Sequence, residues 1–172
     1  SRTTTSPRRG DIHRFVTLPG SVRAQQQVTL HAKVPGYVRA ISVDRGDTVR
    51  AGQVLAELDL PEITAERGKL EAEARFAQAE ADRIKAARAQ APDLITPQLA
   101  DQAAARLASA QAALRGNDAL LAYGRVTAPF AGTITQRHVD PGAFVPAATA
   151  SAGPSSAAVV TLADYQVVRI HV

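Results

Sequence analysis

The sequence predicts an α+β protein in which a small β-sandwich is interrupted by a long antiparallel α-helical coiled-coil hairpin. Three observations lead to this prediction. A short β-rich phrase occurs twice in the 172 residues, at 34–49 and again at 130–145. The sequence between the two copies has the composition and the heptad spacing of a coiled coil. Prolines near its middle divide it into two helices, which a short loop must set antiparallel.

The two copies of the β-rich phrase share their turn chemistry. The run VPGYVRAISVDRGDTV is matched by FAGTITQRHVDPGAFV, with glycines and an aspartate at the same places. Aspartate accepts hydrogen bonds from the nearby backbone, and glycine adopts positive φ without strain. We therefore predict structural turn roles for six matched residues, which are Gly36, Asp44, Gly46, Gly132, Asp140 and Gly142. A paired-carboxylate site formed by Asp44 and Asp140 is the alternative.

Three segments precede the helical part of the chain. Residues 1–10 are polar and basic without periodicity, which predicts a disordered tail. Residues 11–33 contain short apolar alternations on either side of a PGS turn, which predict short strands. Residues 34–60 hold several β-rich runs separated by turn residues. That spacing is typical of a small sandwich or barrel.

Residues 61–122 predict the hairpin. A first helix is expected over 61–90, with proline at its first position. Its seven-residue repeat is Ile63, Leu70, Ala77 and Ile84, with Ala74 and Ala81 between them. Thr96 is a good N-cap for a second helix over 97–122. The repeat of that helix is Leu107, Leu114 and Leu121, with Ala103 and Ala110 between them. The tip is expected at about 90–96.

The second β half is expected at 123–162. The run VVTLAD at 159–164 overlaps its end and resembles VLAELD at 54–59. The loop of small residues at 146–157 is expected to be mobile. Residues 163–172 alternate as a strand does, and the sequence stops within them. Because the sequence also begins without methionine, we expect it to be cut from a longer protein.

Composition and charge exclude several classes of function. The chain has no cysteine, so disulfides, thiolate metal sites and a cysteine nucleophile are excluded. The net charge is +4, and five arginines lie in the first 23 residues. No basic face carries interleaved aromatic residues, as stacking on single-stranded nucleic acid requires. We favour a solvated basic tail over a nucleic-acid site. Weak attraction of this tail to anionic lipid headgroups is an intermediate interpretation. No apolar run reaches the roughly 18 residues that span a bilayer.

The residues that could carry chemistry form no recognisable site. The four histidines, His13, His31, His138 and His171, make no i, i+4 pair. Ordinary surface or strand-edge positions are favoured for them over a metal site. The chain also lacks methionine, and therefore the soft ligands for Cu(I) or Ag(I). Motifs for nucleophilic catalysis and nucleotide binding do not occur. We predict no catalytic residue, no cofactor and no metal.

In this order the segments resemble a known family. The runs are LPGSVRAQQQVTLHAKVPGYVRAISVDRGDTVRAGQVLAELD, LITPQLADQAAARLASAQAAL, RVTAPFAGTITQRHVDPGAFV and VVTLADYQVVRIHV. Together they cover nearly all of 11–172, and the ordered set is similar to the periplasmic adaptors, or membrane fusion proteins, of tripartite efflux pumps. The LITPQLADQA run is most similar to the branch that works with resistance-nodulation-division (RND) transporters. The duplicated halves also resemble lipoyl and biotinyl carrier domains.

The resemblance implies a division into domains. A lipoyl-like domain would comprise 34–60 and 123–162, with the hairpin 61–122 inserted between its halves. Segments 11–33 and 163–172 would belong to a partial β-barrel. In the carrier domains a modified lysine lies at the turn between the halves. None of the three lysines here, Lys33, Lys69 and Lys85, is placed for that role.

The resemblance also implies a docking tip. In the family the tip meets an outer-membrane channel through an arginine, a leucine four residues later and a serine seven beyond that. Counting back from Thr96, the equivalents here are Lys85 and Ala89, so the leucine is lost and Leu94 is its possible substitute. The implied partner-binding residues are Lys85, Ala89, Pro92, Asp93, Leu94 and Thr96. The alternative for Thr96 is a simple helix cap, and both roles are compatible.

The function implied by the resemblance is that of a non-enzymatic adaptor in the periplasm, anchored to the inner membrane by a segment outside this sequence. Its partners would be an inner-membrane RND-type transporter, a TolC-like outer-membrane channel and further copies of itself in a ring, as a trimer or hexamer. It would take part in the export of small molecules and bind no nucleic acid. One alternative is an adaptor of a type I secretion system or ABC-type exporter. A second is a lipoyl or biotinyl carrier domain.

Overall fold

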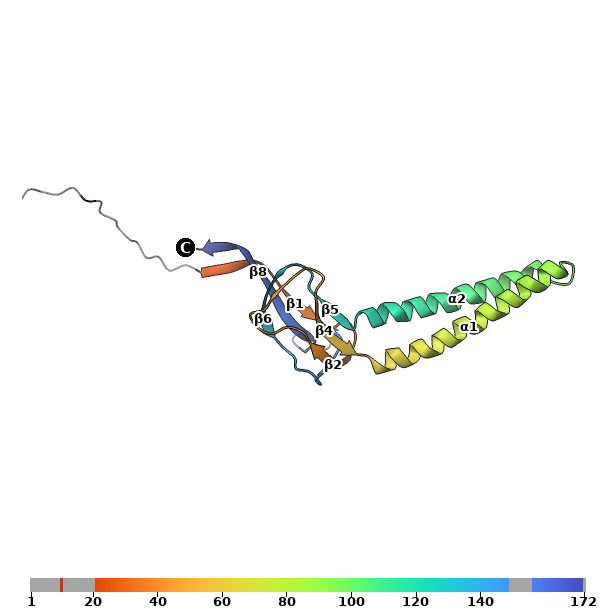
Figure 1. Ribbon diagram of the computed structural model, residues 1–172, viewed down its shortest axis with the longest axis horizontal. Helices are drawn as coiled ribbons and strands as arrows, with labels where there is room; N and C mark the ends of the chain where they lie inside the picture. Colours follow the sequence, from red (N-terminus) through yellow and green to blue (C-terminus); the bar gives the residue numbers. More distant parts are fainter. Residues whose placement is uncertain (1–9, 11–20, 149–155, 172) are drawn as a thin grey trace, which may run out of the picture.

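The computed structural model describes residues 10, 21–148 and 156–171 (Figure 1). The expected tail at 1–10, except for residue 10, lies outside the described residues, and so do residues 149–155 of the loop at 146–157 that was expected to be mobile. Two β-sheets form a central body. A long helical hairpin projects from one end of this body, and a two-stranded ribbon extends from the other (Figure 1). The predicted α+β class, a β-sandwich interrupted by an antiparallel hairpin, is confirmed.

The elements follow one another in the predicted order. They are β1 (Ser21–His31), β2 (Gly36–Ile41), β3 (Thr48–Val49), β4 (Val54–Asp59), α1 (Pro61–Gln90), α2 (Pro97–Ala122), β5 (Arg125–Thr127), β6 (Gly132–Arg137), β7 (Phe144–Val145) and β8 (Ala158–His171). Both helices begin and end where proline, cap and heptad signals predict. Local signals suffice there because they act within one helix.

The strands form two four-stranded antiparallel sheets. Their strand orders are β1-β8-β6-β3 and β5-β4-β2-β7. The core contains aliphatic side chains, of which the largest fully buried ones are Val38, Val49, Leu55, Ile134, Val145, Val159, Val160 and Leu162. No aromatic side chain is among them, so the core is thin.

The two β halves exchange their edge strands. β3 of the first half pairs with β6 of the second through Thr48 and Thr133. β7 of the second half pairs with β2 of the first through Phe144 and Tyr37. These two residue pairs occupy the same places in the repeated phrase. Each sheet is therefore completed only by a strand from the other half.

Backbone hydrogen bonds repeat the same exchange. The amide of Gly46 donates to the carbonyl of Ile134 over 2.8 Å, and the amide of Gly142 donates to the carbonyl of Val38 over 2.7 Å. Val38 and Ile134 are themselves matched positions, and both are buried. The repeated phrase thus encodes a pseudo-twofold sandwich in which each turn is held by the opposite half.

The two turns have the geometry that their sequences predict. Asp47 donates from its amide to the carbonyl of Asp44, and Ala143 does so to Asp140, each over 3.1 Å. The third position of each turn is a glycine with positive φ, which is 96° for Gly46 and 88° for Gly142. A residue with a side chain adopts that conformation only with strain.

The turn role predicted for Gly36 and Gly132 is wrong. Both are the first residues of strands, β2 and β6. A Cβ atom on Gly132 would lie 2.5 Å from the carbonyl oxygen of Ala163, and one on Gly36 would lie 2.7 Å from that of Asp59. Glycine is required at both places because two backbones approach closely, and not because the chain turns.

The register of β8 differs by one residue from the resemblance seen in the sequence. Leu162 pairs with Ile134 as Leu58 pairs with Val38. β4 at 54–59 is therefore equivalent to 158–163 and not to VVTLAD at 159–164. The letters alone favour the wrong register, whereas burial decides it, since Leu58 and Leu162 both lie in the core.

The expected domain boundaries at 33/34 and 162/163 lie close to or within continuous β structure. β8 crosses the second boundary as a single strand. Residues 29–31 of β1 pair with β8 as β5 pairs with β4. These three residues thus have a counterpart inside the sandwich, although β1 also continues into the ribbon. The division into lipoyl-like and barrel domains stays a prediction.

The hairpin grows from two neighbouring strands. Only Leu60 separates β4 from α1, and α2 returns to β5 through Tyr123 and Gly124. The amide of Leu58 donates to the carbonyl of Gly124 over 2.7 Å and closes the base. α1 has 30 residues, so at about 1.5 Å per residue it is roughly 45 Å long.

The close approach at Gly132 gives a stability prediction. Gly132→Ala should lower the free energy of unfolding by about 1–3 kcal/mol, because the new Cβ must displace the backbone of β8. Gly68→Ala is the matched control, since that helical glycine faces open space and the change should stabilise by about 0.5–1 kcal/mol. Urea unfolding measures both. Equal stability of Gly132→Ala and the unaltered protein would contradict the close-approach argument.

Candidate functional site

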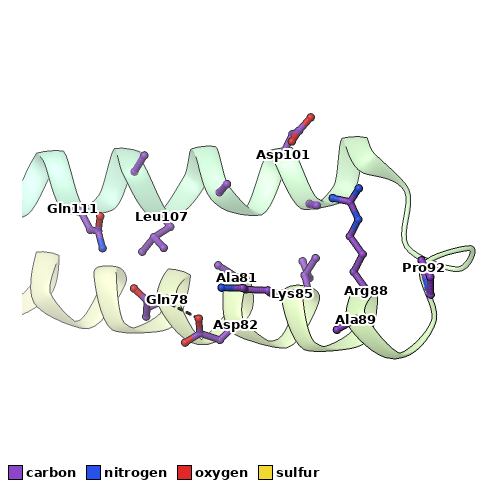
Figure 2. Close-up of a pocket in the computed structure, with 14 residues that line it drawn as sticks. Gln78, Ala81, Asp82, Lys85, Arg88, Ala89, Pro92, Asp101, Leu107 and Gln111 are labelled. Carbon is purple, nitrogen blue, oxygen red and sulfur yellow. Dashed lines mark hydrogen bonds between the residues drawn. The ribbon is translucent and has the colours of Figure 1, made fainter.

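A groove lies on one face of the hairpin near its tip. It has a volume of 740 Å³ and is lined by side chains of both helices and by Pro92 of the loop. Leu107 points into the space between the helices, and Arg88 reaches from α1 towards α2 (Figure 2). Five of the fourteen lining residues are alanines. The groove therefore has a small-residue floor and charged groups along its rim.

The structure brings together three of the six predicted partner-binding residues. Lys85, Ala89 and Pro92 line the groove along α1 and the start of the loop. Asp93 and Leu94 lie beyond it in the loop, and both are exposed. Leu94 is 81% exposed, more than any other large apolar side chain among the described residues. The tip thus presents an isolated leucine next to a groove.

Thr96 caps α2. Its hydroxyl accepts a hydrogen bond from the amide of Leu99 over 3.3 Å, and its backbone is extended, as an N-cap requires. The cap role considered for this residue is therefore present. A contact of Thr96 with a channel stays a prediction.

Several groove residues were missed by sequence reasoning. Asp82 and Arg88 line the groove, although Arg88 has the appearance of an ordinary solvated charge in the sequence. Gln78 donates from Nε2 to Oδ1 of Asp82 over 3.0 Å (Figure 2). The spacing of Gln78, Asp82, Lys85 and Ala89 by three or four residues marks one helix face. That spacing is the signal that could have identified them.

The opposite face of the hairpin has a different character. Phe76 is 55% exposed there, and the guanidinium of Arg106 lies 5.5 Å from the centre of its ring. Arg106 also donates to Glu80 from Nη1 over 3.2 Å. One face is thus a small-residue groove, whereas the other carries a protruding aromatic ring with a stacked cation.

Asp44 and Asp140 share one arginine. Arg137 donates from Nη1 to Oδ1 of Asp140 over 2.6 Å and from Nε to Oδ1 of Asp44 over 3.3 Å. The amide of Arg45 and then the Arg137 guanidinium lower the pKa of the Asp44 carboxyl. General acid catalysis needs a raised carboxyl pKa, so this geometry stabilises two turns and does not favour the paired-carboxylate alternative.

The histidines, lysines and helices add no further site. His138 contacts the hydroxyl of Thr161 over 2.8 Å through Nε2. The ammonium of Lys33 lies 4.7 Å from the centre of the Tyr123 ring. Within 21–148 and 156–171, no three histidine, aspartate or glutamate side chains are placed to hold a metal ion. No helix of the described part has the length and apolar character to cross a membrane. His13 lies outside the described residues.

The architecture defines a class of protein: a two-half β-sandwich with a helical hairpin inserted between the halves. Residues 26–161 match the family described as RND membrane fusion protein (MFP), barrel-sandwich hybrid domain. This match spans most of the sequence. The chain therefore belongs to the RND membrane fusion proteins, and the family resemblance seen in the sequence is confirmed.

Similar proteins include two named multidrug resistance protein MdtA. The one from Pectobacterium carotovorum is 30% identical over 138 residues, which are 73% of this chain and 33% of the relative. The one from Proteus mirabilis is 28% identical over 147 residues, 78% of this chain and 36% of the relative. The chain thus spans about a third of the length of these curated relatives.

A solved structure shares the arrangement of sandwich and hairpin. It is a MacA–MexA chimeric protein that contains the Pseudomonas aeruginosa MexA α-hairpin domain. The TM-score is 0.73 at 26% sequence identity, over 84% of this chain and 50% of the other. The likeness includes the hairpin, the element that carries the candidate site.

The cap of α2 gives a second prediction. Thr96→Ala should lower the free energy of unfolding by about 1 kcal/mol, because the amide of Leu99 loses its acceptor. Thr96→Ser keeps an acceptor and should stay close to the unaltered protein. Chemical denaturation followed by circular dichroism measures the difference. An alanine variant as stable as the serine variant would show that the cap bond contributes nothing.

The environment of Asp44 gives a pH prediction. Its pKa is lowered in the folded protein, so its contribution to stability is present above the unfolded value of about 4 and is lost as pH falls through the lowered folded value. Asp44→Asn should therefore flatten the acid-side decline of the unfolding free energy. Arg137→Gln should flatten it less, because the larger cause, the Arg45 amide, remains. Identical acid-side slopes in Asp44→Asn and the unaltered protein would contradict the assignment.

Proposed function

We propose that this chain is the sandwich and hairpin part of a periplasmic adaptor in a tripartite RND-type efflux pump. Such an adaptor links an inner-membrane transporter to an outer-membrane channel and supports the export of small molecules. Membership of the RND membrane fusion family supports this function. The relatives named multidrug resistance protein support small molecules as the exported class.

The proposal rests on one observation. The helical hairpin and the two-stranded ribbon leave the sandwich at opposite ends (Figure 1). The pseudo-twofold requires this arrangement. β4 and β5 carry the hairpin, whereas their counterparts β8 and β1 pair onward into the ribbon, as far as His171 and Ser21. A body with a long lever at one end and continuing β structure at the other is suited to joining two partners across a distance.

The tip is the proposed contact with the channel. Lys85, Ala89 and Pro92 offer a groove, and Leu94 offers an exposed apolar side chain beside it. A groove with a charged rim fits the helical end of another protein, because apolar ridges enter the groove and charges fix its direction. Asp93 and Thr96 are assigned to the same contact. Further copies of the chain, arranged in a ring, would enclose the path for export.

The test is site-specific cross-linking at the tip. The 172 residues contain no cysteine. In the full-length protein, with any cysteine outside these residues replaced by serine, Leu94→Cys introduces a single reactive thiol. In cells of the source bacterium we expect a specific adduct with an outer-membrane channel, identified by mass spectrometry. Ala119→Cys is the control, because this exposed residue lies near the other end of α2 and should give no channel adduct.

The opposite result is equally informative. If neither Leu94→Cys nor cysteines at neighbouring tip positions give a channel adduct, while expression and export stay normal, the tip is not the docking end. Such a protein would serve an exporter that works without that channel. A lipoyl or biotinyl adduct on any lysine, seen by intact mass, would overturn the adaptor function in favour of a carrier domain.

A further inference from the structure

The net positive charge of the chain comes from one short segment. Residues 1–23 contain five arginines and one acidic residue, Asp11, so their net charge is +4. The whole chain has 20 basic and 16 acidic residues, so residues 24–172 contain 15 of each kind and are neutral overall. The arginines that carry the excess are Arg2, Arg8, Arg9, Arg14 and Arg23.

This segment leads into the end of the molecule that lies opposite the hairpin tip. β1 begins at Ser21, at the outer end of the ribbon, where it pairs with His171 of β8 (Figure 1). Arg14 precedes Ser21 by seven residues, and a chain spans at most about 3.5 Å per residue, so Arg14 is no more than about 25 Å from this end. The basic segment is thus tied to the end of the body that faces away from the hairpin.

The outer end of the ribbon places two arginines directly opposite one another. The register of β1 and β8 pairs Arg23 with Arg169. Like charges that lie opposite each other on two strands destabilise the pairing. Residues 21–24 and 168–171 include no acidic residue that could offset the two charges from a neighbouring register position. An anion beside the two arginines would turn this repulsion into attraction.

The ribbon end also separates polar from apolar positions. Successive residues of a strand lie on opposite faces, and residues directly opposite each other share a face. One face therefore has the polar positions and the other has the apolar ones, which are Ser21, Arg23, Arg169 and His171 against Val22, Ala24, Val168 and Ile170. The two opposed arginines thus belong to a single polar face.

The spacing of the arginines favours an extended anionic surface over a shaped site. They are spread over 2–23 without a period, and one more comes from the far end of the sequence, Arg169. Single-stranded nucleic acid needs aromatic side chains among the basic ones for stacking, and Phe15 is the only aromatic residue in 1–23. A membrane with anionic lipids offers many headgroups, so it binds clustered arginines without requiring a fixed spacing.

We propose that the basic end, which comprises the five arginines of 1–23 together with Arg169, binds anionic lipid headgroups. The shared chemistry is that of guanidinium groups with phosphate, which form charge-assisted hydrogen bonds. Each basic residue close to an anionic membrane raises the partition coefficient about fivefold. Binding at this end directs the hairpin away from the membrane. Only the identity of that membrane, the inner one, rests on the proposed adaptor function.

Co-sedimentation of the 172-residue chain with lipid vesicles tests the basic end. We expect binding to vesicles of phosphatidylcholine mixed with phosphatidylglycerol, little binding to pure phosphatidylcholine, and loss of binding at high salt. Arg23→Gln with Arg169→Gln should lower the partition coefficient about 25-fold, because it removes two charges from the basic end. Arg75→Gln with Arg83→Gln is the matched control, since it removes two exposed charges from the hairpin and should leave binding unchanged.

Three outcomes would overturn the proposal. Equal binding to neutral and mixed vesicles would show that anionic headgroups are not recognised. Equal losses in the two double variants would show that only the total charge of the molecule matters. Displacement of the vesicles by inorganic phosphate at constant ionic strength would show a site for free phosphate in place of a lipid surface.

Hydrogen exchange separates lost binding from lost folding. Arg169→Gln removes the like-charge opposition to Arg23, so amides of the ribbon end should exchange about twofold more slowly while lipid binding weakens. Weaker binding together with faster exchange of these amides would trace the loss to unfolding of the ribbon and overturn the assignment of Arg169. The channel adduct of Leu94→Cys is measured independently, so a failure of lipid binding leaves the proposed export function in place.

Discussion

The structure depends on the exchange of edge strands between the two β halves. β3 completes the sheet that contains β6 and β8, and β7 completes the sheet that contains β2 and β4. Neither half closes a sheet of its own. Anything inserted between the halves must therefore return to the place where it left, or both sheets lose an edge. An antiparallel hairpin meets this requirement, because its two ends lie side by side on β4 and β5.

The matched positions of the two halves show which residues the fold requires and which it only tolerates. Gly36 and Gly132 are identical because both sheets need the same close approach of two backbones. Tyr37 and Phe144 form an exposed edge-to-face pair with ring centres 5.3 Å apart, whereas threonines fill the matched positions in the other sheet. Since the threonine pair holds the same register, the aromatic pair is not a requirement of the sandwich.

The helices and the repeat could be predicted from the sequence because their signals are local. Prolines, a cap and a seven-residue period act within one helix, and turn glycines act within four residues. The register of β8 and the role of Gly132 depend on a neighbouring strand, so both were predicted wrongly from the sequence. The burial of Asn117 in α2 could have been predicted, since this residue continues the series Ala103 and Ala110 by seven more positions. It was missed because only apolar members of the series were followed.

The composition of the seam between α1 and α2 accounts for the groove near the tip. Seam alanines fill little of the space between two helical cylinders, so grooves remain on both faces, one beside Ala81 and the other beside Ala77 and Ala110. Leucine throughout would have filled these grooves and left no concave surface near the tip. A small-residue seam is also weakly cohesive, because each layer buries little apolar area. The groove near the tip thus follows from holding two long helices together with few large side chains.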